Sequence, residues 1–314
     1  MTTHFTDLAR RVAADGQVTA NEVLALRREG WGDGIITREE AEALFAINNA
    51  LGARDEEFCD FFVEAVGEFV LNGTPPRLQC DDEEADWLIA QIDHDGVVES
   101  YVELETIVRI IERAENVPVK LKNYVIAQVE SEVLSGTGPT RCGGELSDVH
   151  ITGAEAKILR RVVFASGGHG PAAVSRYDAE MLFRLKDATL AEANAPEWDE
   201  LFLDGVSNYL KGFALQNAQL EHGRAKELQA FIADNKANVG RFIGQMAREV
   251  PQVRNNFGKV FGKKNAEPTI AEQAAAGEAV TDHEQEWLDT MMERDGEIDE
   301  LERRLIARII DDGE

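Results

Sequence analysis

Carboxylate side chains recur at a fixed spacing around short turns in this sequence, and their oxygens are of the kind that bind hard cations such as Ca²⁺. In most of these turns an aspartate, usually followed by glycine, precedes an aliphatic residue, an oxygen-bearing side chain and, three residues later, a second carboxylate. The turns begin at Asp15, Asp33, Asp95, Asp148 and Asp295. In the Asp95 turn the expected acid position holds Val102, and Glu103 stands next to it. The chemistry to consider first is therefore cation binding.

These turns resemble the second half of an EF-hand calcium loop, in which glycine allows a sharp bend and a final glutamate binds the ion with both oxygens. The resemblance implies calcium ligands at Asp15, Glu22, Asp33, Glu40, Asp295 and Glu302. Neighbouring oxygens extend the candidate set to Glu29, Asp93, Asp95, Glu293 and Asp299. No turn carries both acids that open an EF-hand loop. The resemblance therefore implies weak Ca²⁺ binding, best at the Asp33 and Asp295 turns.

The same turns are also similar to those of the helical TerB-like domain of tellurite-resistance proteins, in which an Asp-Gly turn precedes an acidic helix start more than once. This second resemblance implies an all-helical metal- or stress-resistance protein that binds ions without the conformational switch of a calcium sensor.

A third interpretation of the turns requires no metal. A Thr, Ser or Asp followed three residues later by Glu is typical of a capping box, in which each residue accepts a hydrogen bond from the backbone amide of the other. The pattern occurs at Thr19–Glu22, Thr37–Glu40, Thr152–Glu155 and Asp299–Glu302. Capping and cation binding are compatible, so both remain open at this point.

Apolar residues recur at helical spacing along most of the chain. Phe58, Phe61, Phe62, Ala65, Val66, Phe69 and Val70 form one such stripe, and an i, i+3, i+4, i+7 pattern predicts an amphipathic helix. Runs of glycine and proline at 73–76, 135–144 and 167–171 interrupt the helical pattern. The sequence predicts an all-α protein.

Four blocks of the sequence recur in the same order, which indicates an internal duplication. The matching ranges are 15–29 with 148–162, 37–50 with 175–188, 56–73 with 196–212, and 87–99 with 287–299. Trp87 and Trp287 open the last pair, and we expect both to be core anchors. The predicted organisation is a first repeat unit (1–137), a linker (138–144), a second unit in two parts (145–212 and 284–314) and an insertion (213–283).

The charge of the chain limits its partners. The 314 residues contain 59 acids and 32 Lys and Arg residues, a formal net charge of -27. Such a charge disfavours nucleic acid and anionic membranes and favours cations or basic proteins. The N-terminus lacks an apolar leader, and three cysteines without a close pair are typical of cytosolic thiols. We expect a cytoplasmic protein.

The insertion departs from this charge balance. Segment 235–264 contains seven basic residues and one acid, with apolar residues at helical intervals, so it is predicted to be a basic amphipathic helix. Its candidate partner-binding residues are Arg241, Phe242, Met246, Arg248, Arg254, Phe257, Lys259 and Phe261. Such a helix packs on its own domain or docks on an acidic surface of its own chain or of a protein partner. Residues 265–281 have the composition of a linker.

No nucleophile stands beside a base in the sequence, so we expect a binding protein and not an enzyme. The expected activity is cation binding or protein interaction through an acidic surface. The alternatives are the TerB-like role and a purely structural scaffold without metal.

Overall fold

A computed structural model of the chain describes residues 2–30, 35–93, 98, 100–141, 149–165, 174–213, 282–292 and 298–311. The first eight helices are α1 (Thr2–Asp15), α2 (Ala20–Gly30), α3 (Arg38–Ala50), α4 (Glu56–Asn72), α5 (Asp82–Ile92), α6 (Tyr101–Arg113), α7 (Val119–Ser135) and α8 (Gly153–Val163). They are followed by α9 (Arg176–Ala188), α10 (Pro196–Phe213), α15 (Asp282–Met292) and α16 (Glu300–Asp311). Within these ranges there is no strand, so the all-α prediction is confirmed.

The chain forms two compact units, Met1–Ala172 with Ala191–Ala195, and Ala173–Leu190 with Pro196–Glu314. The predicted linker 138–144 therefore lies inside the first compact unit, and α8 belongs to that unit although its sequence repeats that of α2. In the described part of the chain, no helix combines the length and the hydropathy that crossing a bilayer requires.

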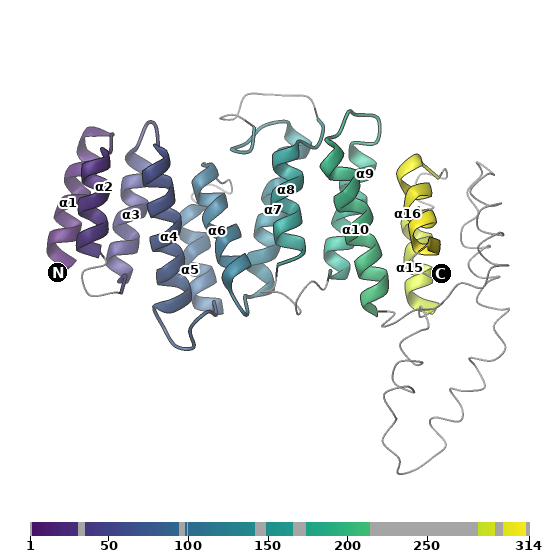
Figure 1. Cartoon of the computed structure of the whole chain (residues 1–314), viewed down its shortest axis with the longest axis horizontal. Helices are drawn as coiled ribbons and strands as arrows, with labels where there is room; N and C mark the ends of the chain where they lie inside the picture. The colour runs from purple at the N-terminus through teal and green to yellow at the C-terminus, as the bar shows by residue number, and fades with distance from the viewer. Residues whose placement is uncertain are drawn as a thin grey trace, which may run out of the picture. The chain divides into compact units, whose positions relative to one another are not determined.

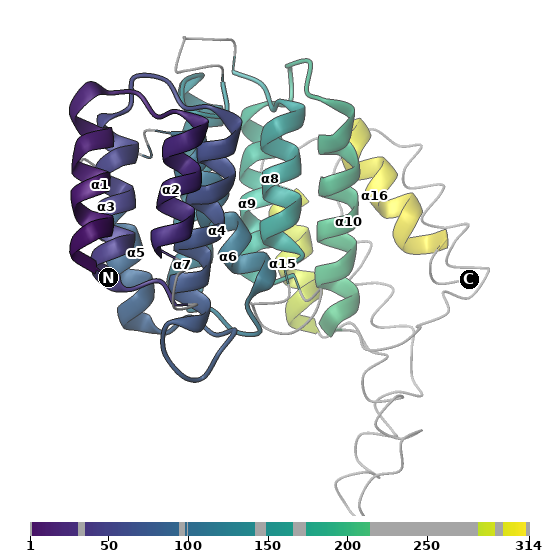
Figure 2. The ribbon, with the colours of Figure 1, turned by 60° about the vertical axis from the view of Figure 1, so that its left-hand side comes forward.

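In the first unit the helices stand side by side (Figures 1 and 2). Helix α1 packs on α2 and α3, and α4 packs on α2, α3 and α6. Helix α7 contacts α5, α6 and α8. Each helix buries one stripe: in α6 the aliphatic side chains of Ile107, Val108, Ile110 and Ile111 are buried, while Arg109 between them is mostly exposed. This is the amphipathic pattern that the sequence predicts.

Aromatic side chains form the core of each unit around one tryptophan. The Trp87 ring meets the edges of Phe45 and Phe69 at centroid distances of 5.9 and 4.8 Å. In the second unit the Trp287 ring meets Phe183 and Tyr209 in the same T-shaped manner at 5.8 and 4.7 Å. Both tryptophans are buried, which confirms that they are core anchors.

Ion pairs join neighbouring helices at the surface. Arg161 of α8 binds both Glu105 and Glu112 of α6, at 2.6 and 2.8 Å, and thereby ties the last helix of the first unit to its neighbour. In the second unit Arg304 and Arg308 of α16 pair with Asp199 and Asp204 of α10. These pairs use part of the acid surplus to hold helices together.

Candidate functional site

The repeated turns begin helices through reciprocal capping. At the start of α3 the Thr37 amide donates to the Glu40 carboxylate at 2.9 Å, and the Glu40 amide donates to the Thr37 hydroxyl at 3.3 Å. The same two-way bonding occurs at the other predicted positions, Thr19–Glu22, Thr152–Glu155 and Asp299–Glu302. The capping prediction is therefore confirmed at these four turns.

Three further capping boxes were missed in the sequence. They are Asp81–Glu84, Ser100–Glu103 and Ser175–Asp178. In the Asp95 turn the repeat pattern aligns Glu99 with the cap, but the N-cap is Ser100. The acid of this turn is therefore Glu103, one residue later than the repeat predicts, and the local Ser-x-x-Glu pattern carries the signal that locates it.

Three of the capping glutamates are also buried and bound by a side chain from elsewhere in the same unit. Asn48 of α3 donates to Glu103 at 2.6 Å, and Arg141 donates to Glu155 at 2.7 Å. Lys186 of α9 donates to Glu302 at 2.7 Å. Of these three, only Glu302 is a candidate calcium ligand, and it too receives a protein donor, because a buried charge requires a partner.

The Lys186 ammonium is surrounded by carboxylates. Its Nζ lies 2.5 Å from Asp299, 2.7 Å from Glu302 and 3.0 Å from Asp187, and only 2% of the side chain is exposed. A protein ammonium therefore occupies the position between Asp299 and Glu302 that a bound cation would need. The sequence analysis missed Lys186, because it lies 113 residues from Asp299 along the chain.

The pKa values in this cluster follow from one cation facing several acids. Burial lowers the pKa of Lys186, but hydrogen bonds to Asp299 and Glu302 outweigh it and raise the pKa above its ordinary value. Burial raises the pKa of Glu302 to about 7 against the opposing effect of Lys186. Lys186 is thus charged at neutral pH.

Of the predicted metal ligands that can be described, Asp299 and Glu302 lie together, and the Lys186 ammonium binds both. Asp33, Asp95, Glu293 and Asp295, the side chain of Asp15 and the whole predicted partner-binding set from Arg241 to Phe261 lie outside the described residues. Glu29 is exposed, and Glu22 and Asp93 are half-buried. No three His, Cys, Asp or Glu side chains of the described ranges are placed to hold a metal ion. Calcium binding at the Asp33 and Asp295 turns stays a prediction.

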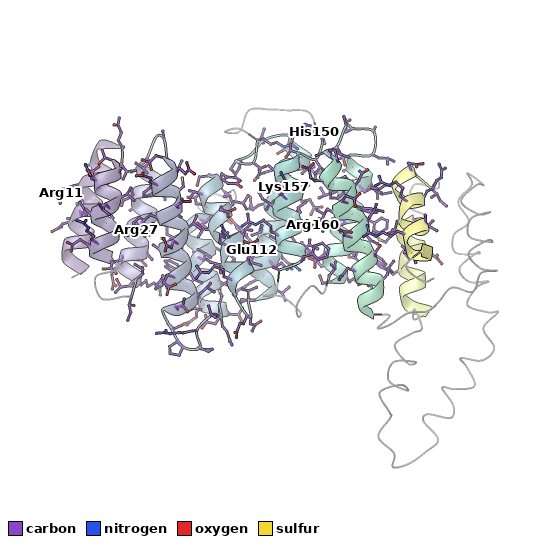
Figure 3. The ribbon with its side chains drawn as sticks, in the orientation of Figure 1. Arg11, Arg27, Glu112, His150, Lys157 and Arg160 are labelled. Atoms are coloured by element: carbon purple, nitrogen blue, oxygen red, sulfur yellow. The ribbon has the colours of Figure 1, made fainter. Side chains whose placement is uncertain are left out.

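A groove of 440 Å³ lies over α4 between α2 and α6. Its lining residues are Arg27, Asp60, Val63, Glu64, Gly67, Leu71, Glu105, Arg109 and Arg113. Arg27 pairs with Glu64 at 2.7 Å, and Arg109 with Glu105 at 3.2 Å. Figure 3 labels Arg27 on α2 and Glu112 on α6. The Arg27–Glu64 pair joins α2 to α4, the Arg109–Glu105 pair lies within α6, and Arg113 of α6 lies 4.0 Å from Glu68 of α4. We interpret the groove as a surface seam between these three helices.

A second buried acid lies at the end of α7. The Glu132 carboxylate accepts hydrogen bonds from the amide, at 2.9 Å, and the hydroxyl of Thr140, while its other oxygen is buried and accepts none from the residues that the structure describes. Burial raises the pKa of Glu132. A Cβ on Gly138, whose φ is +140°, would lie 2.2 Å from Glu132 Cγ. Gly138 therefore packs directly against the Glu132 side chain.

The chain was compared with models of protein families, with curated proteins and with solved structures, and no match was found. The interpretation of its function therefore depends on its own geometry and charge.

Proposed function

We propose that this chain is a non-enzymatic, acidic helical interaction module that binds basic amphipathic helices. The proposal rests on the difference between the buried carboxylates and the exposed ones. The buried ones are bound by amides, Asn48, Arg141 and Lys186, whereas the surplus faces solvent. Asp82 and Asp86 of α5 keep 82% and 70% of their side-chain area exposed. Exposed acids attract basic partners and raise the rate at which they associate.

The sequence itself contains a segment of the complementary kind. Segment 235–264 has a net charge of +6 in a chain of -27, and its apolar residues follow helical spacing. The same chemistry in a partner protein would fit the same surface. We therefore propose two sources for the ligand, this segment or a basic helix of a partner.

The proposal is tested with a labelled peptide of residues 235–264, titrated by fluorescence anisotropy with the full chain and with a variant that lacks this segment. We expect saturable binding that weakens as salt rises, because salt screens exposed charges. The matched control is a peptide of identical composition with scrambled apolar spacing, which should bind at least about tenfold more weakly.

The two protein forms distinguish the sources of the ligand. Tighter binding by the shortened variant indicates that the full chain covers its own surface, and equal binding indicates a surface kept for a partner. Absence of saturable binding to either form, or equal affinity for the scrambled peptide, would overturn the proposal.

We also infer that the two aromatic cores descend from one duplicated unit. Phe45 and Phe62 lie 5.0 Å apart at 84°, and Phe183 and Phe202 lie 5.2 Å apart at 78°. Each tryptophan indole donates to a glutamate, Trp87 to Glu42 and Trp287 to Glu180. The agreement of contacts between rings from several helices supports a common ancestor more strongly than sequence similarity in one block does.

A further inference from the structure

We propose that a corner of the first unit, formed by the α4–α5 connection and the start of α7, is the docking surface for a basic amphipathic helix of a partner, with Leu78 as its apolar anchor. This inference rests on the function proposed above and names the surface that performs it. The acidic corner comprises Leu78, Asp82, Glu83, Asp86, Glu115 and Val119.

Backbone hydrogen bonds fix the connection in place. The Leu78 amide donates to the Leu71 carbonyl at 2.7 Å, and the Leu78 carbonyl accepts from the Glu115 amide at 2.7 Å. The next residue, Gln79, forms a parallel bridge with Asn116, and the Cys80 amide donates to the Asn116 carbonyl at 3.0 Å. The residues before α5 and before α7 are thus joined by backbone hydrogen bonds. They lie at the lower ends of the helices in Figure 1, where the loop after α4 projects.

Leu78 adopts a backbone conformation that costs free energy. Its φ is 61°, in the left-handed region that residues other than glycine rarely adopt. The side chain is 37% exposed. Val119, at the start of the helix that follows Asn116, is 49% exposed. Two aliphatic side chains are therefore held toward solvent on a well-ordered backbone.

Carboxylates surround this apolar pair. Lys120, next to Val119, binds Asp86 at 2.6 Å and Asp82 at 3.0 Å, which places both aspartates at the same corner. Glu83 and Glu115 are exposed as well. Lys120 pairs with two of these four acids, and the exposed Arg77 precedes Leu78. Four acids against two basic residues leave the corner with a negative charge.

Charge complementarity identifies the occupant. An apolar pair inside an acidic rim fits a helix with a narrow apolar stripe flanked by Lys and Arg, because the stripe covers Leu78 and Val119 while the basic side chains reach the rim. An anionic or purely apolar partner would leave the rim carboxylates without counter-charges. The 235–264 peptide has the required pattern and serves as the probe.

The anchor is tested by Leu78→Asn in the full chain and in the variant lacking 235–264. Asparagine tolerates the left-handed conformation, so the loop keeps its backbone while the apolar anchor is lost. The matched control is Leu24→Asn, which removes a similarly exposed leucine from α2. We expect Leu78→Asn to weaken peptide binding by about tenfold or more and Leu24→Asn by less than about twofold. Thermal unfolding of both variants shows whether they fold.

The rim is tested by the double variant Asp82→Asn/Asp86→Asn, with Asp7→Asn of α1 as the exposed control. The double variant should bind the peptide more weakly and with less salt dependence. If the unmodified protein binds the peptide but Leu78→Asn and the rim variant bind as their controls do, the surface is wrong and the proposed function stands. If the unmodified protein does not bind, the proposed function itself fails.

Discussion

At the scale of single residues, the free energy of the fold depends on how buried carboxylates are satisfied. Glu132 is the clearest case because burial raises its pKa, while Thr140 supplies only part of the hydrogen bonding that its ionised form requires. A raised pKa means that this side chain favours folding below its unfolded pKa and that the contribution is lost as pH rises through the folded value.

Glu132→Gln should therefore stabilise the protein more at pH 8 than at pH 4, since glutamine imitates the protonated acid. Denaturant unfolding at both pH values measures the difference. Glu130→Gln, on the same helix α7, is the matched control. A stabilisation that is equal at the two pH values would contradict the assignment of the raised pKa to Glu132.

Residues with local partners could be predicted from the sequence, and residues with distant partners could not. Thr37 and Glu40 stand three positions apart and cap the same turn, so their spacing contains the whole interaction. Glu132 meets Thr140 through a loop, and Lys186 meets Glu302 across 116 positions. Neither distance leaves a periodic signal in a single sequence, so the buried donors of the capping glutamates were missed.

At the scale of elements, the α9–α16 contact depends on the protonation of Glu302. The folded pKa of about 7 lies above the ordinary value of 4.5, so this contribution to the stability of the second unit falls as pH rises from about 4.5 to about 7. The neighbouring Lys186 contributes to stability over a different pH range. Its raised pKa means that its contribution is present below its ordinary pKa of 10.5 and is lost at higher pH.

Glu302→Gln should remove the change in stability that Glu302 causes between pH 4.5 and pH 8, because glutamine does not titrate. Unfolding is followed at several pH values for the variant and for Glu300→Gln, an exposed residue of the same helix. The control should keep the pH profile of the unmodified protein. A Glu302→Gln profile parallel to the control would show that Glu302 does not titrate in this window.

Helix positions could be predicted from the sequence where an apolar stripe runs along one face of the helix, as in α4 and α6. Sequence similarity between blocks does not by itself give the grouping of helices into compact units, because a compact unit is defined by contacts in space. Arg161 illustrates the difference: its helix α8 repeats α2 in sequence, yet its guanidinium binds Glu105 and Glu112 of α6 and places α8 in the first unit.

At the scale of the whole molecule, the similar aromatic contacts of the two units predict that loss of the central tryptophan destabilises each unit. Trp87→Leu and Trp287→Leu should each destabilise the unit that contains the tryptophan by about 2–4 kcal/mol, because each removes ring contacts and leaves a cavity. Because the chain contains four tryptophans, two in each unit, differential scanning calorimetry and not tryptophan fluorescence should follow the unfolding of the two units. Tyr101→Ala, at an exposed aromatic, is the control and should change little. A Trp287 variant as stable as that control would contradict the equivalence of the two cores.

Because Lys186 supplies the positive charge at the Asp299–Glu302 helix start, we expect the fold of the second unit not to depend on a dissolved cation. A dissolved ion can be diluted, exchanged or removed by a chelator, whereas this positive charge is covalently attached to α9 and always present at its carboxylates. The Asp299–Glu302 helix start is therefore maintained in ion-poor medium and in the presence of chelators. A single lysine side chain thus allows this helix start to form without a bound metal ion.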